Sequence, residues 1–363
     1  MDLQFWKDKK VLITGHTGFK GSWLSLMLQH LGAEVTGISL PPDTVPNLFD
    51  ESNCVEGMVS VYQDIRDAQK LESLFQKHQP EIVFHLAAQA LVRRSYDNPV
   101  ETYETNVMGT LYVLEAIRKT PSVCAGVIVT SDKCYENREW QQGYVESDAM
   151  GGFDPYSSSK GCAELLTASF RNSYFSKDTF DTHNTAIASA RAGNVIGGGD
   201  WSEDRLIPDI LNGFQNNQEV NIRNPNAIRP WQHVIEPLVG YLCLANRLFV
   251  DGVAYAEAWN FGPDECGAMP VDWIADKMSE VWADGASWCA DGKDHPYEAR
   301  FLALDCTKAK TQLDWSPKWN LNETIERIVI WHKSFISGKD AKELCLAQIK
   351  EYLELVGLCC FEE

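Results

Sequence analysis

The chain has 363 residues, 44% of them hydrophobic, and its 32 Lys and Arg against 51 Asp and Glu give a net charge of −19. This apolar content excludes a disordered chain, and the length favours two domains or one large α/β unit with a second lobe. Nucleic acids and anionic membranes are not expected as partners, because both bind basic surfaces.

The patterns of cysteine, histidine and apolar residues bear on the cellular compartment and on metal binding. Residues 1–10 are polar, and one of the longest apolar runs, residues 123–129, is far shorter than the roughly 18 residues that span a bilayer. The eleven cysteines are odd in number and scattered without a CxxC pair, which indicates reduced thiols. No HExxH pair occurs, so we expect no metal site. We therefore expect a cytoplasmic protein.

Short apolar runs alternate with helical patterns through the first half of the chain. This alternation implies parallel crossovers, so the predicted fold class is α/β, a Rossmann-like doubly wound parallel sheet. We expect residues 1–192 to form this domain, rejoined by a segment at about 232–262, and residues 193–363 to form mainly a smaller loop-rich lobe and C-terminal helices. Strands are predicted at residues 10–15, 35–40, 81–86, 126–130 and 186–191, and helices at residues 21–31, 67–78, 100–119 and 322–357, whereas residues 193–231 show no regular alternation.

A glycine-rich turn, GxxGxxG, follows the first predicted strand and opens the first predicted helix. Its glycines permit a tight turn and let backbone N–H groups approach a pyrophosphate at the helix N-terminus. Lys20 either adds a charge contact to the pyrophosphate or belongs to a solvated helix face. The turn predicts a dinucleotide site formed by Gly15, Thr17, Gly18, Phe19, Lys20 and Gly21.

The place after the second predicted strand normally carries an acidic residue that holds the adenosine ribose. Here it falls near Ser39, and the first carboxylate is Asp43. No arginine stands beside Ser39 to receive the 2′-phosphate of NADP, so NAD is favoured as the cofactor. Asp64 and Ile65 follow a short strand and are candidates to cap the adenine, although a solvated loop aspartate explains Asp64 nearly as well.

The strongest signal is the segment Tyr156-Ser157-Ser158-Ser159-Lys160. Asp154 suits the N-cap and Pro155 the first helical position, so Tyr156 and Lys160 should lie one turn apart on one helix face. We expect the lysine ammonium to lower the pKa of the tyrosine, which prepares it to take a proton from a substrate hydroxyl. The pattern gains specificity because it follows the glycine turn by about 140 residues, with Thr130-Ser131 at a strand end between them.

Together these motifs resemble the extended short-chain dehydrogenase/reductase family, in particular its nucleotide-sugar branch. The resemblance implies a catalytic triad of Ser131, Tyr156 and Lys160. It also implies a homodimer, with a tetramer left open, formed through the helix at residues 100–119. The residues that it implies around the cofactor are Leu86, Ala87, Ala88, Gln89, Asn106 and Thr130, together with Tyr156 and Lys160. Those that it implies around the substrate are Arg93, Asn194 and Arg229. For Arg205 and Arg223, contact with the substrate and a place on the surface are equally favoured.

Asp132-Lys133 takes the place of a second acid/base pair found in sugar-nucleotide 4,6-dehydratases. The segments at residues 15–23, 130–137, 191–201 and 229–234 resemble those of the dehydratases that act on CDP-glucose. The resemblance implies C4 oxidation by NAD, loss of water across C5 and C6 with Asp132 as acid and Lys133 as base, and return of hydride to C6. Lys133 must be neutral to act as a base, which requires a pKa well below the usual value of about 10.4. Its position in the site is therefore better supported than its role as the base.

Three alternatives stay open at this stage. A dehydratase for GDP-mannose or dTDP-glucose would use the same residues, and a nucleotide-sugar 4-epimerase needs Tyr156 and Lys160 but not the acid/base pair. A non-catalytic dinucleotide-binding sensor normally lacks the Tyr or the Lys. Beyond the site, His16, His85 and Trp23 are expected to be structural, and Trp201 either stacks on the base or fills the lobe.

Overall fold

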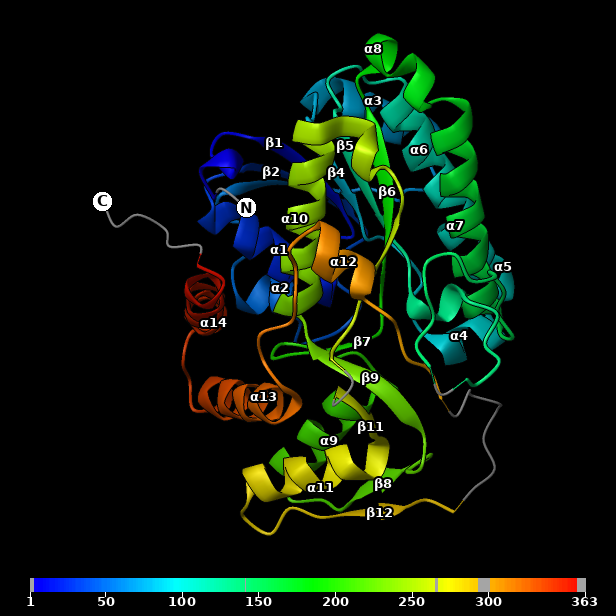
Figure 1. The fold of residues 1–363 in the computed structure, drawn as a ribbon. Coiled ribbons are helices and arrows are strands. Elements are labelled where there is room, and N and C mark those ends of the chain that lie inside the picture. The colour runs from blue at the N-terminus through cyan, green and yellow to red at the C-terminus, as the bar shows by residue number, and fades with distance from the viewer. Residues whose placement is uncertain (1–2, 141, 265–266, 293–300, 358–363) are drawn as a thin grey trace.

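A computed structural model describes residues 3–140, 142–264, 267–292 and 301–357. Its centre is a parallel seven-stranded sheet with the order β10-β6-β5-β4-β1-β2-β3 (Figure 1). The order changes direction between β1 and β4, which is the switch point where doubly wound sheets bind ligands. The strands are β1 Lys10–Thr14, β2 Glu34–Ser39, β3 Met58–Tyr62, β4 Ile82–His85, β5 Ala125–Val129, β6 Ala186–Ala192 and β10 Ala258–Phe261. The predicted fold class and the five predicted strands are confirmed.

Helices cover both faces of this sheet (Figure 1). α1 Phe19–His30 and α10 Ile235–Asp251 lie on one face, and α3 Ala68–His78, α6 Thr110–Arg118 and α7 Pro155–Ser173 lie on the other. In β1, Val11 and Ile13 enter the first core and Leu12 enters the second. Strands buried on both faces must be apolar throughout, which is why these segments read as continuous apolar runs.

α10 and β10 return to the sheet after the chain has left it. β10 pairs with β6, and α10 packs on β5 and β6. Residues 235–255 are long and apolar enough to cross a membrane by length and composition alone. Leu238, Tyr241 and Leu244 are nevertheless fully buried in the sheet core, so within the described structure α10 is a core helix.

The second lobe lies beyond the carboxyl ends of the strands and has its own small core (Figure 1). The expectation of an irregular segment at residues 193–231 is wrong in part, because α9 and three strands fall within it. Strands of three residues are too short to show an alternating pattern. The elements of the lobe are β7 Asn194–Ile196, α9 Leu206–Gln215, β8 Val220–Ile222, β9 Ile228–His233, β11 Ala268–Pro270, α11 Val271–Trp282, β12 Trp288–Ala290 and α13 Leu321–Ile336. The helices α12 Thr307–Gln312 and α14 Ala341–Leu355 pack instead on the core of the sheet domain.

The helix predicted at residues 100–119 has three parts. It consists of α5 Pro99–Tyr103, a π-helical segment Glu104–Gly109 and α6. A π-helical turn often marks a functional position, because its wider turn redirects side chains. The remaining short elements are α2 Leu48–Glu51, α4 Val92–Asp97, α8 Phe180–His183 and the 3-10 turns Leu3–Trp6, Asp132–Cys134, Lys177–Thr179 and Gly252–Tyr255.

Candidate active site

The glycine turn is packed so tightly that side chains are excluded from it. Gly15 has φ of +80°, and a Cβ there would lie 2.7 Å from the backbone N of Ala87. A Cβ on Gly21 would lie 2.0 Å from the carbonyl O of Gly15. Gly18 is the N-cap of α1 and has no side chain that could accept hydrogen bonds from the first N–H groups of the helix. These N–H groups therefore have no side-chain cap. This cradle fits the pyrophosphate of a dinucleotide.

At the end of β2, hydroxyl groups occupy the place where a carboxylate is usual. The Thr17 and Ser39 hydroxyls hydrogen-bond at 2.8 Å, and Thr17 also donates to the carbonyl of Leu40 at 2.9 Å. The buried ring of His16 lies over Gly37 and its Nε2 contacts Ser60 Oγ at 2.7 Å. Burial lowers the pKa of His16 to about 4, so the ring is neutral and packs as part of the protein interior.

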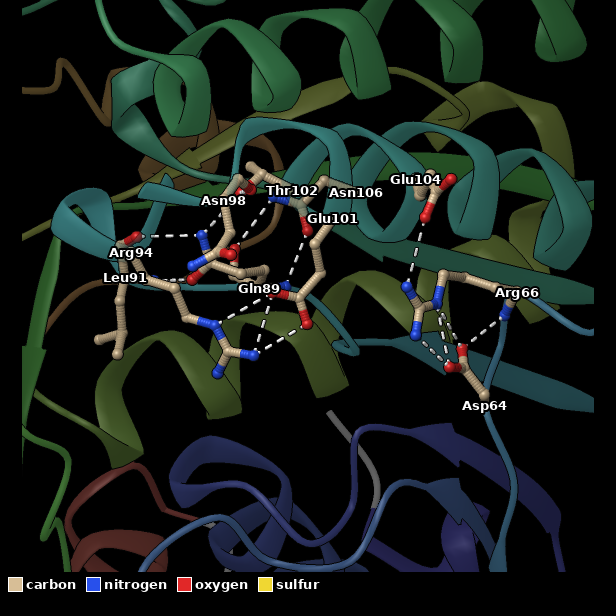
Figure 2. Close-up of polar contacts among 10 residues, drawn as sticks. All are labelled: Asp64, Arg66, Gln89, Leu91, Arg94, Asn98, Glu101, Thr102, Glu104 and Asn106. Atoms are coloured by element: carbon tan, nitrogen blue, oxygen red, sulfur yellow. Dashed lines mark hydrogen bonds and ion pairs between the residues drawn. The ribbon is translucent and has the colours of Figure 1, made fainter. Parts of the chain in front are cut away.

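Asp64 is held by a neighbouring arginine, Arg66, that the sequence pattern did not reveal (Figure 2). The Asp64 carboxylate lies 2.7 Å from Arg66 Nη2 and accepts the Arg66 backbone N–H at 2.8 Å, which lowers the pKa of Asp64. Arg66 also reaches Glu104 at 3.4 Å. Ile65 is buried against Gly109. Asp64 is therefore not a freely solvated aspartate, and its contact with adenine stays a prediction.

Asn106, in the π-helical segment, fixes the loop that follows β4 (Figure 2). Its Oδ1 accepts from the backbone N of Gln89 at 2.9 Å, and its Nδ2 donates to Gln89 O at 3.0 Å and to Ser159 Oγ at 2.9 Å. The Gln89 amide donates to Leu91 O and to Thr102 Oγ1, each at 3.0 Å. The loop containing Leu86, Ala87 and Ala88 is thus joined to the helix that carries Lys160.

The serine, tyrosine and lysine of the predicted triad meet at the end of β5. Asp154 caps α7 by accepting from Ser157 N at 2.9 Å, and Pro155 is the first helical residue, as predicted. The buried Tyr156 hydroxyl hydrogen-bonds Ser131, and Lys160 Nζ donates to Val129 O at 3.4 Å. The side chain of Thr130 points elsewhere and donates to Glu164. The arrangement can move a proton between Tyr156 and a bound hydroxyl.

The expected lowering of the tyrosine pKa is wrong for this structure. Burial raises the pKa of Tyr156 to about 12, and this outweighs the hydrogen bond with Ser131 and the charge of Arg205, which act in the opposite direction. Burial likewise lowers the pKa of Lys160 to about 8. A sequence pattern reveals the neighbouring cation but not the loss of hydration around the phenol.

Asp132 is a buried carboxyl group, and one of its two oxygens has no hydrogen-bond partner within the described chain. It is 2% exposed, and its Oδ1 accepts from Ser131 Oγ at 3.0 Å. Its Oδ2 has no hydrogen-bond partner within the described chain and lies 3.3 Å from where a Cβ on Gly193 would stand. Burial raises the pKa of Asp132 against the charges of Lys133, Arg229 and Lys20. Lys133 follows half-buried, and its role as base stays a prediction.

Lys20 is half-buried on the first turn of α1 and interacts with charged groups of the active site, and its contact with the pyrophosphate stays a prediction. Burial lowers the pKa of Lys20 to about 7, helped by the charges of Arg205 and Lys160 and opposed by Asp132. Sequence spacing placed Lys20 beside the pyrophosphate but gave no signal that it approaches Asp132. That proximity arises only when the sheet brings the ends of β1 and β5 to one edge.

Four arginines line the second lobe beside this site. Arg93 and Arg223 each contact Asp204 Oδ1 at 2.8 Å, and Arg205 contacts Asp200 at 3.1 Å. Arg229 is buried on β9, and its Nη1 donates to Ile228 O at 2.9 Å. Sequence reasoning missed Asp200 and Asp204, although their position just before Arg205 is a usable signal. Contacts of these arginines with a substrate diphosphate stay predictions.

Of the remaining residues singled out from the sequence, Trp23 and His85 are buried, and Asn194 and Trp201 are half-buried. Asn194 opens β7 and stands opposite Trp231 of β9. Trp23 is fully buried and donates to Gly198 O at 3.0 Å, as expected for a core residue. Trp201 packs on Trp331 and Phe335, which favours its filling the lobe. His85 contacts Thr14 at 2.7 Å and Thr110 at 2.9 Å.

A doubly wound sheet with a dinucleotide cradle after β1 and a Ser-Tyr-Lys cluster at the end of β5 defines an enzyme of the nucleotide-cofactor class. The chain belongs to the family described as GDP-mannose 4,6 dehydratase, whose model matches residues 12–328. It is 54% identical over 353 residues to the CDP-glucose 4,6-dehydratase of Salmonella typhimurium, which covers 97% of this chain and 98% of that protein.

Solved structures share the fold. The epimerase Mth375 of Methanothermobacter thermautotrophicus superposes with a TM-score of 0.79 at 25% identity, over 92% of this chain and 95% of that chain. A dTDP-glucose 4,6-dehydratase of Bacillus anthracis, solved in complex with NAD, superposes with a TM-score of 0.73 at 20% identity, over 93% of this chain and 99% of that chain. At such identities the likeness establishes the fold alone.

Proposed function

We propose that this protein is a hydro-lyase that converts CDP-D-glucose into CDP-4-dehydro-6-deoxy-D-glucose and water. The observation that carries the proposal is the pair formed by the buried Asp132 and the half-buried Lys133 beside Ser131, in a chain 54% identical to a CDP-glucose 4,6-dehydratase. A 4-epimerase has no need of an acid/base pair beside the triad, so the pair favours a dehydratase.

NAD is the proposed cofactor, and the tight turn at Gly15, Gly18 and Gly21 fits its pyrophosphate. When bound, NAD supplies a hydride acceptor for C4 and a hydride donor for C6, so the overall reaction is a dehydration. The Thr17–Ser39 pair, at the end of β2, would face the adenosine ribose. We propose that residues 1–192, with the return at about 232–262, form the cofactor-binding domain and that the lobe in residues 193–363 binds the nucleotide sugar.

Tyr156 is the proposed base for the 4-hydroxyl of glucose. Ser131, whose hydroxyl donates to Asp132 in this structure, would stabilise the Tyr156 phenolate once it turns its proton toward Tyr156. Lys160, whose pKa is about 8, is mostly protonated at neutral pH and adds positive charge to the same pocket. Ser131 and Arg205 lower the pKa of Tyr156 against the larger effect of burial.

The elimination step falls to the adjacent pair. A ketone at C4 acidifies the C5 proton, and Lys133 in its neutral form would remove that proton. Asp132 would protonate the departing 6-hydroxyl. Burial raises the pKa of its carboxyl, which favours the protonated form that a general acid needs.

The proposed assembly is a homodimer of cytoplasmic enzyme. An apolar surface runs over α5 and the π-helical segment, where Val100 is 69% exposed and Tyr103 and Met108 are also exposed. An apolar patch of this kind on a soluble protein marks an interaction surface. A second copy of the same helix would cover it with like residues, as a two-fold interface requires.

An activity screen tests the proposal. Purified protein is incubated with CDP-, dTDP-, UDP- and GDP-hexoses, and the products are identified by mass spectrometry. CDP-glucose should yield a 4-keto-6-deoxy product without net cofactor reduction. Turnover of GDP-mannose or dTDP-glucose in place of CDP-glucose would contradict the substrate assignment, and a C4 epimer as the product would contradict the reaction.

A further inference from the structure

A buried carboxylate lies behind the catalytic residues and joins three elements of the sheet domain. Glu164, on α7, is 4% exposed at its side chain. Its Oε1 accepts a hydrogen bond from Thr130 Oγ1 at the end of β5. Its Oε2 accepts from Ser189 Oγ at 2.7 Å and from Arg191 Nη2 at 2.8 Å, both on β6. The carboxylate is thus fully engaged, which is what an ionised group needs in a buried place.

Arg191 extends these contacts to the other end of the catalytic segment. Its Nη1 donates to the Tyr135 hydroxyl at 2.6 Å, and its guanidinium lies 4.9 Å from the centre of the Tyr135 ring. Tyr135 in turn donates to Asn260 Oδ1 at 2.7 Å. Thr130 and Tyr135 bracket Ser131, Asp132 and Lys133, so the Glu164–Arg191 ion pair holds both ends of the segment that carries them.

Glu164 also acts on Lys160, which lies one helical turn before it on the same face of α7. The Glu164 charge raises the pKa of Lys160 against the effect of burial. The other titratable groups that interact with Lys160 are Cys134 beside β5, His85 on β4 and Lys20 on α1. Arg171, also on α7, interacts with Glu164. Among these, Glu164 is the largest influence that keeps Lys160 protonated.

We propose that Glu164 is a positioning residue for the dehydratase reaction: paired with Arg191, it fixes the segment 130–135 against α7, one helical turn from Lys160. This inference rests on the proposed function. Glu164 does not touch substrate, and it acts through Thr130, Arg191 and Lys160. Removing one partner of a buried ion pair also destabilises the fold, so the effect on the site must be read from catalysis and from the pH profile of folded protein.

The test is the pH dependence of kcat/KM for CDP-glucose in three variants. In Glu164→Gln, Lys160 should lose its proton at lower pH, so the basic limb should move down by about one pH unit or more. Glu164→Asp keeps the charge and should return the limb toward the wild-type position. Thr130→Val breaks one positioning contact without changing a charge, and should lower kcat about tenfold with KM and the limb little changed. Glu236→Gln is the control for replacing a buried, hydrogen-bonded glutamate elsewhere in the fold, because Glu236 holds residues 318–319 and Tyr352; burial raises its pKa to about 7, whereas, despite burial, the pKa of Glu164 is lowered by Arg191.

The outcomes separate the possibilities. A folded Glu164→Gln variant with wild-type kcat and an unmoved basic limb overturns the proposal, and so does an equal shift of the limb in Glu236→Gln. If Glu164→Gln does not fold, Thr130→Val decides, and an unchanged kcat there overturns the positioning role. A wild-type protein that does not dehydrate CDP-glucose refutes the proposed function instead.

Discussion

Replacing Asp132 with asparagine should separate the two halves of the proposed reaction. Asparagine has the shape of aspartate, fits the same buried place and can still accept the Ser131 hydrogen bond, which measures 3.0 Å. Its amide cannot give a proton to the departing hydroxyl. Losing a positioned general acid slows a step by about 10²- to 10⁴-fold, which corresponds to about 3–5 kcal/mol of barrier. Oxidation at C4, which depends on Tyr156, should survive.

The assay is a rapid-mixing experiment with CDP-glucose that follows the absorbance of the reduced nicotinamide and, by chemical quench, the loss of water. The Asp132→Asn variant should accumulate the reduced cofactor, because oxidation proceeds and elimination does not keep pace. A variant that dehydrates at the wild-type rate would refute Asp132 as the acid. A variant that still interconverts C4 epimers at full rate would favour the epimerase alternative.

The pH dependence of the elimination step follows from the same residue. Burial raises the pKa of Asp132, and the protonated form is the active one. The rate of water loss should therefore be highest below that raised pKa and fall as the pH rises through it. In Asp132→Asn this limb should vanish, whereas a persisting limb would assign it to another group.

Three further substitutions test other parts of the account. Tyr156→Phe should lower kcat at least about 10²-fold while the protein still binds NAD, since only the proton acceptor is lost; wild-type turnover would refute Tyr156 as the base. Gly21→Ala places a Cβ 2.0 Å from Gly15 O, so it should lower the free energy of unfolding by about 1–3 kcal/mol and reduce the amount of bound NAD. The control Gly126→Ala, whose Cβ meets its neighbours at 3.4 Å, should do neither. Equal NAD content in the two variants would count against the cradle. Val100→Asp should give monomers in light scattering, and the equally exposed Val250→Asp should not; unchanged dimers would refute the proposed interface.

Sequence patterns predicted what depends on local order. The strands were predictable because a strand buried on both faces is apolar throughout, and α7 was predictable because Asp154 and Pro155 start it. The π-helical segment at Asn106 was not, because an added residue in one turn leaves the apolar pattern nearly unchanged. The placement of Lys20 near Asp132, and of Arg93 and Arg223 on Asp204, depends on distant segments meeting at the sheet edge.

The pKa of Tyr156 shows a second limit of sequence reasoning. A YxxxK pattern states that a cation lies one turn away, but the cost of burying a phenolate depends on how completely the surrounding segments exclude water. In this structure that cost is the larger effect. The residues of the site were therefore easier to predict than their protonation.

The most direct measurement is the product formed from CDP-glucose in deuterated water by the purified protein with NAD. Proton removal at C5 and its return from solvent should leave one deuterium at C5 of a 4-keto-6-deoxy sugar, with hydride moved from C4 to C6 and no net reduction of NAD. A product that retains its 6-hydroxyl, whether unchanged or epimerised at C4, would contradict the account.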